Sequence, residues 1–231
     1  MFHKKIKTSY NLLIMKRITK LELFNYIFFV LVILSCFVLT ITLHLNWLTL
    51  LSCVAGIMYM VFLSDRNILN FIIGFVSSTT YIIIAYKAKL FGEVIFYLIV
   101  DLPMIFISFF MWKKNLDTKL KVYAKRLSLH NSILIIIVSL VAICIYGLFL
   151  KFVGGENVFV DATSTVVSFI ATLLMALRYR EQWFMWIVVY AVSIVMWATT
   201  FDLLMLIMSI CCFVSCFIGY LEWSNAKKKK D

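Results

Sequence analysis

Long, uninterrupted apolar runs constrain this chain more than any other feature of its sequence. Eight runs are long enough, or nearly so, to cross the roughly 30 Å of hydrocarbon in a bilayer. They lie near residues 22–43, 47–63, 68–86, 92–112, 132–153, 159–177, 183–200 and 203–221. Lipid cannot hydrogen-bond exposed backbone, so only helices and closed barrels span it, and these runs lack the alternation of barrel strands. The sequence therefore predicts eight transmembrane helices.

Composition excludes a water-soluble fold. Hydrophobic residues make up 64% of the chain and charged residues 14%, whereas a soluble domain is about half apolar and about a quarter charged. The six cysteines fall within the apolar runs, without the C-x-x-C pairs or histidine partners of a zinc site. His3, His44 and His130 lie in tails or loops, which argues against a haem or metal centre between helices. We therefore predict an all-α integral membrane protein with neither a metal nor a cofactor.

The positive charge indicates topology rather than a nucleic-acid partner. The net charge is +11, but the basic residues lie between the apolar runs and at the two ends of the chain. With the N-terminus inside, 19 of the 22 Lys and Arg residues fall on the inner side, and Lys87, Lys89 and Lys151 fall outside. The positive-inside rule then predicts a multi-pass protein of the cytoplasmic membrane with both termini in the cytoplasm. The first run is too long and too late for a cleavable signal peptide, so we expect a retained helix.

The order of the runs predicts an internal repeat. Trp112 and Trp223 end two triple-helix units and are 111 positions apart, as are Tyr86 and Trp197. One extra helix separates the units, which gives a parallel 3+1+3 arrangement with its substrate site at the interface of the repeats. The predicted segments are a basic N-terminus and extra helix at 1–46, the repeats at 47–112 and 158–223, a basic loop and linking helix at 113–157, and a basic tail at 224–231.

The fourth run carries a polar face within the bilayer. Glu93, Tyr97 and Asp101 are spaced four residues apart, so they share one side of a helix. An isolated Asp101 near the bilayer centre costs about 2.5–3.5 kcal/mol on insertion scales. A cationic ligand or a protonated interhelical hydrogen bond would each compensate that cost, and both remain open. Pro103 lies two residues later and should kink the helix.

Two other runs carry hydroxyl side chains that favour helix packing over ligand contact. In the sixth run Asp161 and Ser168 share a face, but an Asp at the start of a helix is equally well explained as an N-cap. In the third run Gly74, Ser77 and Tyr81 follow a helical spacing, and the small residues there favour close packing between helices.

The seventh run carries an aromatic face. Trp183, Trp186, Tyr190 and Trp197 recur at helical spacing. Trp183 alone could be an interface anchor, but Trp186 and Tyr190 lie deeper in the bilayer. Stacking and cation–π contacts with a flat cationic ring contribute roughly 1–2 kcal/mol each. We therefore predict that this face lines a ligand site.

Residues 161–190 resemble a segment of the PnuC family of nicotinamide riboside transporters. That family has an acidic start, a basic turn and then E-N-W-x-x-W-x-x-x-N, and Glu181, Trp183 and Trp186 stand at matching positions. The fourth run is similar to the family's L-Y-x-x-x-x-x-Q helix, with Leu90 and the closing Trp112 in place. The resemblance covers roughly residues 45–225.

The resemblance implies a fold and a function. Members have a 3+1+3 core related to sugar-transporting SWEET proteins, and some carry an extra first helix. They move unphosphorylated vitamin precursors by facilitated diffusion, and a cytoplasmic kinase then traps the substrate. Nicotinamide riboside carries a cationic pyridinium ring, which agrees with the acidic and aromatic faces.

Three family amides are changed in this chain. Gln182 replaces the Asn before the first Trp, Tyr190 replaces the Asn after the second, and Tyr97 replaces the Gln of the fourth run. A site that hydrogen-bonds its substrate discriminates strongly against altered partners. The transport function survives these changes, but the substrate could instead be thiamine or a nucleoside.

We therefore expect a transporter of a small cationic vitamin precursor, with no nucleic-acid partner, in a membrane of anionic lipid. Trp186 and Tyr190 would stack on the ring, Asp101 and Tyr97 would supply charge and hydrogen bonds, and Trp183 and Gln182 would line the inner mouth; Asp161 and Ser168 complete the predicted site. A substrate-capture subunit of an energy-coupled importer is an alternative, although the first run has none of the Ala or Gly that such docking uses. A membrane-embedded enzyme is a third class, and the oligomeric state, including a homo-oligomer, stays open.

Overall fold

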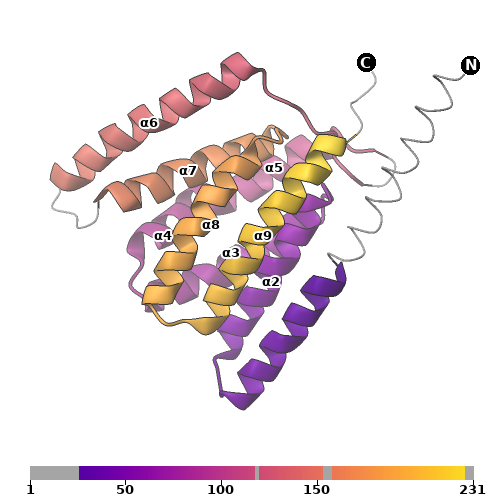
Figure 1. Ribbon diagram of the computed structural model, residues 1–231, viewed down its shortest axis with the longest axis vertical. Helices are drawn as coiled ribbons and strands as arrows, with labels where there is room; N and C mark the ends of the chain where they lie inside the picture. Colours follow the sequence, from indigo (N-terminus) through magenta and orange to yellow (C-terminus); the bar gives the residue numbers. More distant parts are fainter. Residues whose placement is uncertain (1–25, 118–119, 153–157, 227–231) are drawn as a thin grey trace, which may run out of the picture. The chain divides into compact units, whose positions relative to one another are not determined.

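The computed structural model describes residues 26–117, 120–152 and 158–226. In these ranges the protein is all-helical, with eight helices, as the sequence predicts (Figure 1). The chain forms two compact units, Met1–Leu45 and Asn46–Asp231.

The first unit holds one described helix, Tyr26–Thr42. It corresponds to the predicted run at 22–43, whose first residues lie outside the described part of the chain. Its hydroxyl groups bond to the helix itself: Thr40 and Thr42 each donate to a carbonyl oxygen four residues earlier, at 2.8 and 2.9 Å. This pairing lets polar side chains sit in an apolar helix without an unpaired donor.

The second unit holds the remaining helices. Their bounds are α2 Trp47–Ser64, α3 Asn70–Lys87, α4 Phe91–Phe96, the π-helical turn η1 Tyr97–Asp101, α5 Leu102–Lys113, α6 Leu129–Phe152, α7 Val158–Ala176, α8 Gln182–Thr199 and α9 Leu203–Asn225. The elements α4, η1 and α5 follow one another without a break and form a single long helix, Phe91–Lys113.

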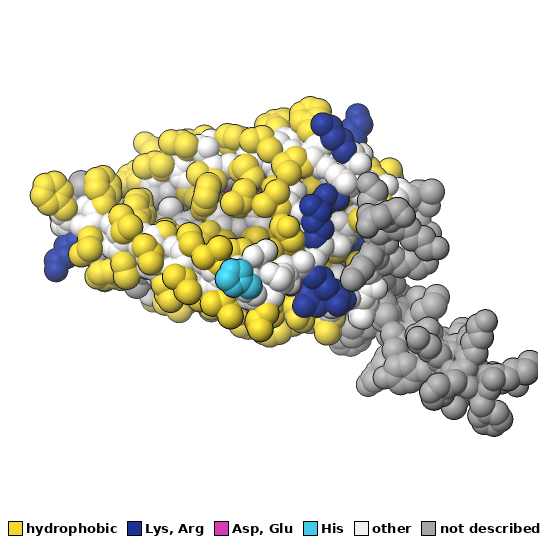
Figure 2. Space-filling model, turned by 90° about the horizontal axis from the view of Figure 1, so that it is seen from above, with side chains coloured by type: hydrophobic (Ala, Val, Ile, Leu, Met, Phe, Trp, Pro, Cys, Tyr) yellow, Lys and Arg dark blue, Asp and Glu magenta, His cyan; other side chains and the backbone are white. Residues whose placement is uncertain are grey.

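The protein is a multi-pass membrane protein. Five described helices are long and apolar enough to cross a bilayer: α2, Phe91–Lys113, Leu129–Phe149 of α6, α8 and α9. Helix α3, which carries four hydroxyl residues in succession at 77–80, is not among the five. Large apolar side chains lie exposed along α6, for example Ile137 and Leu140. Figure 2 shows one face covered mainly by hydrophobic side chains, with Lys and Arg gathered toward one end.

Six helices of the second unit pack in a closed ring. Helix α2 packs on α3, α3 on Phe91–Lys113, that helix on α7, α7 on α8, α8 on α9, and α9 returns to α2 (Figure 1). Helix α6 packs on α7, outside this ring. The ring creates an interior that is separate from the lipid-facing surface, and residues facing inward can therefore be polar.

Local sequence fixes the helix ends. Asn46 and Asp202 are N-caps, whose side chains accept hydrogen bonds from Leu48 N at 2.8 Å and Met205 N at 3.1 Å. At the other end of the ring, α2 and α7 each stop at a turn whose arginine has a left-handed backbone, with φ of 61° at Arg66 and 68° at Arg178.

Pro103 distorts the helix before it, as the sequence predicts, and the distortion is a π-helical turn. Proline has no N–H, and its ring clashes with the carbonyl four residues earlier. Just ahead of it, the Leu102 N–H donates to Tyr97 O, five residues back rather than four. The wider turn carries both Tyr97 and Asp101.

Candidate functional site

The interior of the ring contains a central pocket. Residues from every ring helix line it, and the polar and aromatic members are Tyr59, Ser77, Ser78, Tyr81, Glu93, Tyr97, Asp101, Ser168, Trp186, Tyr190, Ser193, Trp197, Ser209 and Cys212. Both carboxylates lie on the helix Phe91–Lys113, and both indoles lie on α8. Acidic and aromatic groups, which the sequence carries on separate runs, therefore meet in one site.

The two carboxylates are held by hydroxyl groups of neighbouring helices. Ser78 Oγ of α3 donates to Asp101 Oδ2 at 2.5 Å. Glu93 accepts from Tyr81 OH and from Ser164 Oγ, each at 3.4 Å. Glu93 thus connects α3 and α7 at the pocket, whereas Asp101 accepts its hydrogen bond from the short side chain of Ser78.

Aromatic rings make up much of the pocket wall. Tyr81 and Tyr97 stack with ring centroids 4.4 Å apart, and Tyr81 meets Trp197 edge-on at 5.7 Å. On α8, Trp186 and Tyr190 lie 6.0 Å apart with their planes inclined at 32°. Ring faces carry negative charge density, so walls of this kind attract a flat cation.

Trp186 carries an unused hydrogen-bond donor at the pocket. The residue is 7% exposed, and its Nε1 has no hydrogen-bond partner among the described residues. A buried N–H without a partner costs roughly 1–3 kcal/mol. This donor is therefore available to an acceptor that enters the pocket.

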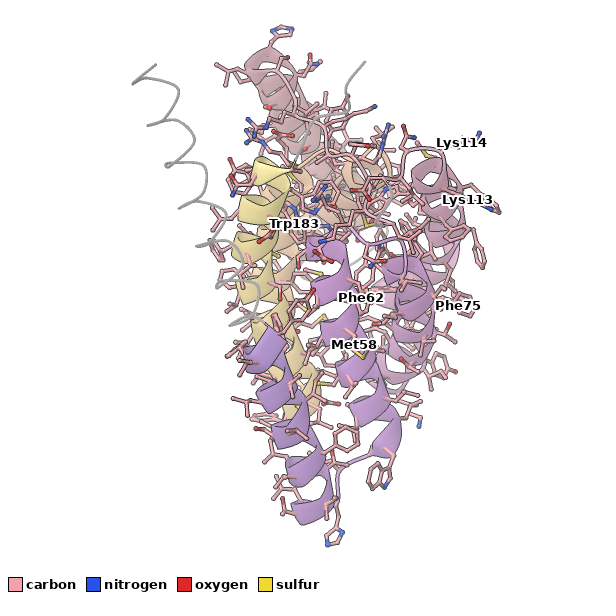
Figure 3. All side chains as sticks on the ribbon, turned by 90° about the vertical axis from the view of Figure 1, so that its right-hand side faces the viewer. Met58, Phe62, Phe75, Lys113, Lys114 and Trp183 are labelled. Carbon is pink, nitrogen blue, oxygen red and sulfur yellow. The ribbon has the colours of Figure 1, made fainter. Side chains whose placement is uncertain are left out.

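Three tryptophans pack together at the end of the ring where α5 and α9 end and α8 begins, and we call them the Trp layer: Trp112, Trp183 and Trp223. All three are at most 1% exposed, and the ring of Trp223 lies 5.7 Å from Trp112 and 6.1 Å from Trp183. A Cβ at Gly219 would lie only 2.3 Å from Trp183, so this indole packs directly on the α9 backbone. Figure 3 shows Trp183 beside α9, toward the end of the ring where Lys113 and Lys114 terminate α5.

The structure brings together five of the eight predicted site residues. Tyr97, Asp101, Ser168, Trp186 and Tyr190 all line the central pocket. The deeper aromatic residues of the seventh run, Trp186 and Tyr190, therefore line the same pocket, and their contact with a ligand stays a prediction.

The other three predicted residues lie elsewhere. Trp183 belongs to the Trp layer, because Gly219 leaves room for it there rather than in the pocket. Gln182 is fully buried, and neither of its amide atoms has a partner among the described residues, but it does not line the pocket. Asp161 lies in the first turns of α7, and its side chain is outside the described part of the structure.

Sequence reasoning left several pocket residues out of the site. Tyr59 of α2 was missed because no polar face was predicted on the run at 47–63. Gly74 and Ser77 were assigned to packing, and Gly74 does pack, since a Cβ there would meet the Tyr59 ring at 3.0 Å. Both also line the pocket. The missing signal was the shared helical face of the hydroxyl run in α3.

The free volume of the central pocket is about 50 Å³. Ligand pockets typically measure roughly 300–1,000 Å³. A vitamin-sized ligand therefore needs the rings to move, and the Tyr81–Tyr97 stack fills the space between the acidic and indole walls. Among the described residues, no group of three or more His, Cys, Asp or Glu could hold a metal ion.

A family model described as nicotinamide mononucleotide transporter matches residues 46–225 of this chain. The chain belongs to this family. The match covers all six ring helices and α6, whereas the helix Tyr26–Thr42 lies before it.

Two relatives in the family are named nicotinamide riboside transporter PnuC. The protein of Neisseria mucosa is 33% identical over 196 residues, which cover 80% of this chain and 74% of the relative. The protein of Haemophilus influenzae is 32% identical over 189 residues, which cover 80% and 83%. A crystal structure of the vitamin B3 transporter PnuC matches with a TM-score of 0.80 and 31% identity, over 87% of this chain and 90% of that one. The family resemblance read from the sequence is confirmed.

Proposed function

We propose that this protein is a membrane transporter that lets nicotinamide riboside cross the cytoplasmic membrane by facilitated diffusion. The single observation that carries the proposal is the central pocket, in which two carboxylates and two indoles from different helices face the same interior. A pyridinium cation needs a negative partner and a flat surface, and this pocket offers both. The names of the relatives agree with this substrate.

The charge of the pocket favours the riboside over the mononucleotide. The two differ by a phosphate, which adds negative charge. Asp101 and Glu93 line the pocket, and no Lys, Arg or His is among its described lining residues. Buried like charges repel strongly in a medium of low dielectric constant. A phosphorylated substrate would therefore meet two acids and no cation.

Each wall has a distinct role in this proposal. Trp186 and Tyr190 stack on the pyridinium ring, and Asp101 neutralises its charge. Tyr97 and the Trp186 Nε1 supply hydrogen bonds to the carboxamide or ribose. Ser168 contributes a hydroxyl from α7.

Helices α2 to α5 and helices α7 to α9 are proposed to form the two triple-helix units of the parallel 3+1+3, SWEET-like repeat. Trp112 Nε1 donates to Met175 O at the end of α7, and Trp223 Nε1 donates to Leu63 O at the end of α2, both at 3.0 Å. Each unit thus clasps the first helix of the other unit with its last helix. This exchange of equivalent contacts is what a pseudo-twofold repeat requires.

Backbone geometry supports the same repeat. The left-handed residues Arg66 and Arg178 are 112 positions apart, as are Lys89 and Phe201. The short segment between α5 and α6 bonds both arginine turns: Val122 N donates to Arg66 O at 2.9 Å, and Lys125 N donates to Arg178 O at 2.7 Å.

Transport would follow from rocking of the two units around the pocket. The excess of Lys and Arg on one side predicts that both termini and the Trp layer face the cytoplasm. Because facilitated diffusion only equilibrates substrate, net uptake needs a cytoplasmic kinase that phosphorylates the riboside. All eight helices cross the membrane in this proposal, and a homo-oligomer is compatible with the exposed apolar surface of α6.

Uptake into liposomes that contain only the purified chain tests the proposal. We expect labelled nicotinamide riboside to equilibrate across the membrane, with nicotinamide mononucleotide excluded. Uptake of the mononucleotide but not the riboside would reverse the substrate assignment.

The same assay separates the alternatives. Equilibration of thiamine in preference to the riboside would favour a thiamine transporter, which Tyr97, Gln182 and Tyr190 in place of the family amides leave open. Tight binding without equilibration would indicate the capture subunit of an energy-coupled importer.

A further inference from the structure

A second cavity lies at the end of the ring opposite the Trp layer. Its volume is about 290 Å³, several times that of the central pocket. We call it the vestibule. Its polar and aromatic lining residues are Asn46, Thr49, Lys87, Trp197, Thr200 and Asp202.

The vestibule is built from helix ends. Asn46 and Asp202 cap the first turns of α2 and α9, while Lys87 and Thr200 lie at the last turns of α3 and α8. These four helices are neighbours in the ring. Charged groups at helix ends lie at the level of the lipid headgroups and water, so this cavity faces the aqueous phase rather than the hydrocarbon.

Trp197 is common to both cavities. It lines the vestibule and the central pocket, and it is 1% exposed. Its indole is held edge-on against Tyr81, which itself belongs to the stack in the central pocket. Trp197 therefore contributes to the walls of both cavities.

The chemistry of the vestibule suits an aromatic cation that carries hydroxyl groups. Asp202 offers a half-buried carboxylate, and Trp197 offers an aromatic floor. Asn46 and Thr200 offer polar rims for sugar hydroxyls, whereas Lys87 is exposed at the edge and disfavours a second cationic group. The volume of about 290 Å³ is close to the lower limit, roughly 300 Å³, of known small-ligand pockets.

We propose that the vestibule is a second, weaker binding site for a ribosylated aromatic cation, and that Trp197 is the gate through which the substrate passes to the central pocket. The proposal rests on the transport function proposed above. It adds a binding step before the central pocket and assigns that step to residues outside it.

The carboxylate can be tested without disturbing the fold. Asn caps helices as well as Asp does, so Asp202→Asn removes the charge and keeps the cap of α9. In a chain whose central pocket is disabled by Asp101→Asn and Trp186→Ala, we expect residual millimolar binding of nicotinamide riboside in calorimetry. Adding Asp202→Asn should weaken that binding by about fivefold or more.

Asp117→Asn, at the opposite end of the ring, is the control and should leave residual binding unchanged. Absence of residual binding, or binding that ignores Asp202→Asn, overturns the vestibule site. If the unmodified chain binds no riboside at all, the transport proposal itself fails, which is a different outcome.

The pH dependence of residual binding gives an independent check. Burial raises the pKa of Asp202, against the opposing effect of hydrogen bonds from the Met205 and Leu204 amides. Lys87 is the other charged residue among the described lining residues. Vestibule binding of a cation should therefore weaken as the pH falls through this raised pKa, and Asp202→Asn should abolish that dependence.

The gate is tested by the rate at which bound riboside leaves the unmodified central pocket. Trp197→Ala removes the indole and should speed dissociation about tenfold or more in stopped-flow fluorescence. Trp197→Phe keeps a ring against Tyr81 and should speed dissociation less than Trp197→Ala does. Equal dissociation rates in all three proteins would overturn the gate.

Discussion

The two helices that end in Trp112 and Trp223 differ in one respect that accounts for the acidic character of the site. In the first, 23 steps separate the left-handed Lys89 from Trp112; in the second, 22 steps separate the left-handed Phe201 from Trp223. The first helix contains the π-helical turn η1, and α9 contains none. A turn closed over five residues instead of four absorbs one additional residue without changing the register beyond it.

The π-helical turn lies in the first half of the ring, α2 to α5, which carries both carboxylates of the pocket. The extra residue lies where Tyr97 and Asp101 face the pocket, while α9 places Met208 and Cys212 there. The first half presents both carboxylates and the phenols of Tyr59, Tyr81 and Tyr97, and the second half presents the two indoles of α8 together with Tyr190. If the halves rock apart, charge recognition and ring stacking separate, so a fully bound substrate holds them together.

The largest contrast is expected from single-residue deletions. Deleting Ile99, a lipid-exposed residue of the π-turn, should convert that turn to regular α-helix and leave a folded protein with at least tenfold weaker riboside binding. Deleting Ile210 from regular α9 should rotate everything beyond it by about 100° and break the Trp223 bond to Leu63. Thermal unfolding in detergent compares the stability of the two deletion variants. A deletion of Ile210 that is tolerated as well as that of Ile99 would refute the comparison.

Removing the charge from the first half should weaken binding strongly. Asp101→Asn keeps a partner for Ser78 but loses the carboxylate, and a hydrogen-bonded charge contributes about 1.5–3 kcal/mol, or roughly 10- to 100-fold in Kd. Trp fluorescence titration with nicotinamide riboside is the measurement. Asp117→Asn, in the same half but outside the pocket, is the matched control, and unchanged affinity in Asp101→Asn would remove that carboxylate from the site.

If the two halves form a repeat, the hydrogen bonds of Trp112 and Trp223 should contribute equally to the free energy of unfolding. Trp112→Phe and Trp223→Phe each remove one buried N–H···O bond of 3.0 Å, at a cost of about 1–2 kcal/mol in unfolding free energy. The exposed Trp47→Phe in α2 should change stability little. Denaturant unfolding compares the three, and a large inequality between the two clasps would argue against equivalent units.

The smallest effect is expected at the left-handed residues. Lys89 and Phe201 have φ of 61° and 56°, a conformation that costs an L-residue about 1–2 kcal/mol but glycine very little. Glycine also loses more entropy on folding, so Lys89→Gly and Phe201→Gly should each stabilise by less than about 1 kcal/mol. Lys113→Gly, at the end of α5, should destabilise instead. If one of these glycine substitutions stabilised the protein and the other destabilised it, the two halves would not be equivalent.

The sequence predicted the helices well because each depends on a local property. The length and continuity of the apolar runs placed α2, α8 and α9 with ends within about four residues of the observed ones. Helical spacing placed Tyr97 and Asp101 on one face and Trp186 and Tyr190 on another. Pro103 predicted a distortion of the fourth run, but not that the distortion would be a π-turn.

The proposed repeat shows two different spacings, and the structure offers a physical reason for the difference. The Trp112–Trp223 pair gives a spacing of 111, whereas the spacing of 112 holds for the left-handed residues. The shift falls across η1, whose extra residue is not visible in a count of apolar positions. At the spacing of 112 Trp197 pairs with Ala85, whereas at the predicted spacing of 111 it pairs with Tyr86.

By itself the sequence determined the class of protein, its helices and the residue types that face inward, because burial in lipid and helical periodicity act along the chain. The tertiary structure alone decided which faces meet. It placed Trp183 against Gly219 in the Trp layer, added Tyr59 and Tyr81 to the central pocket, and made Trp197 common to two cavities. Those contacts join helices far apart in sequence, and their geometry depends on how side chains fill the ring, which no local pattern records.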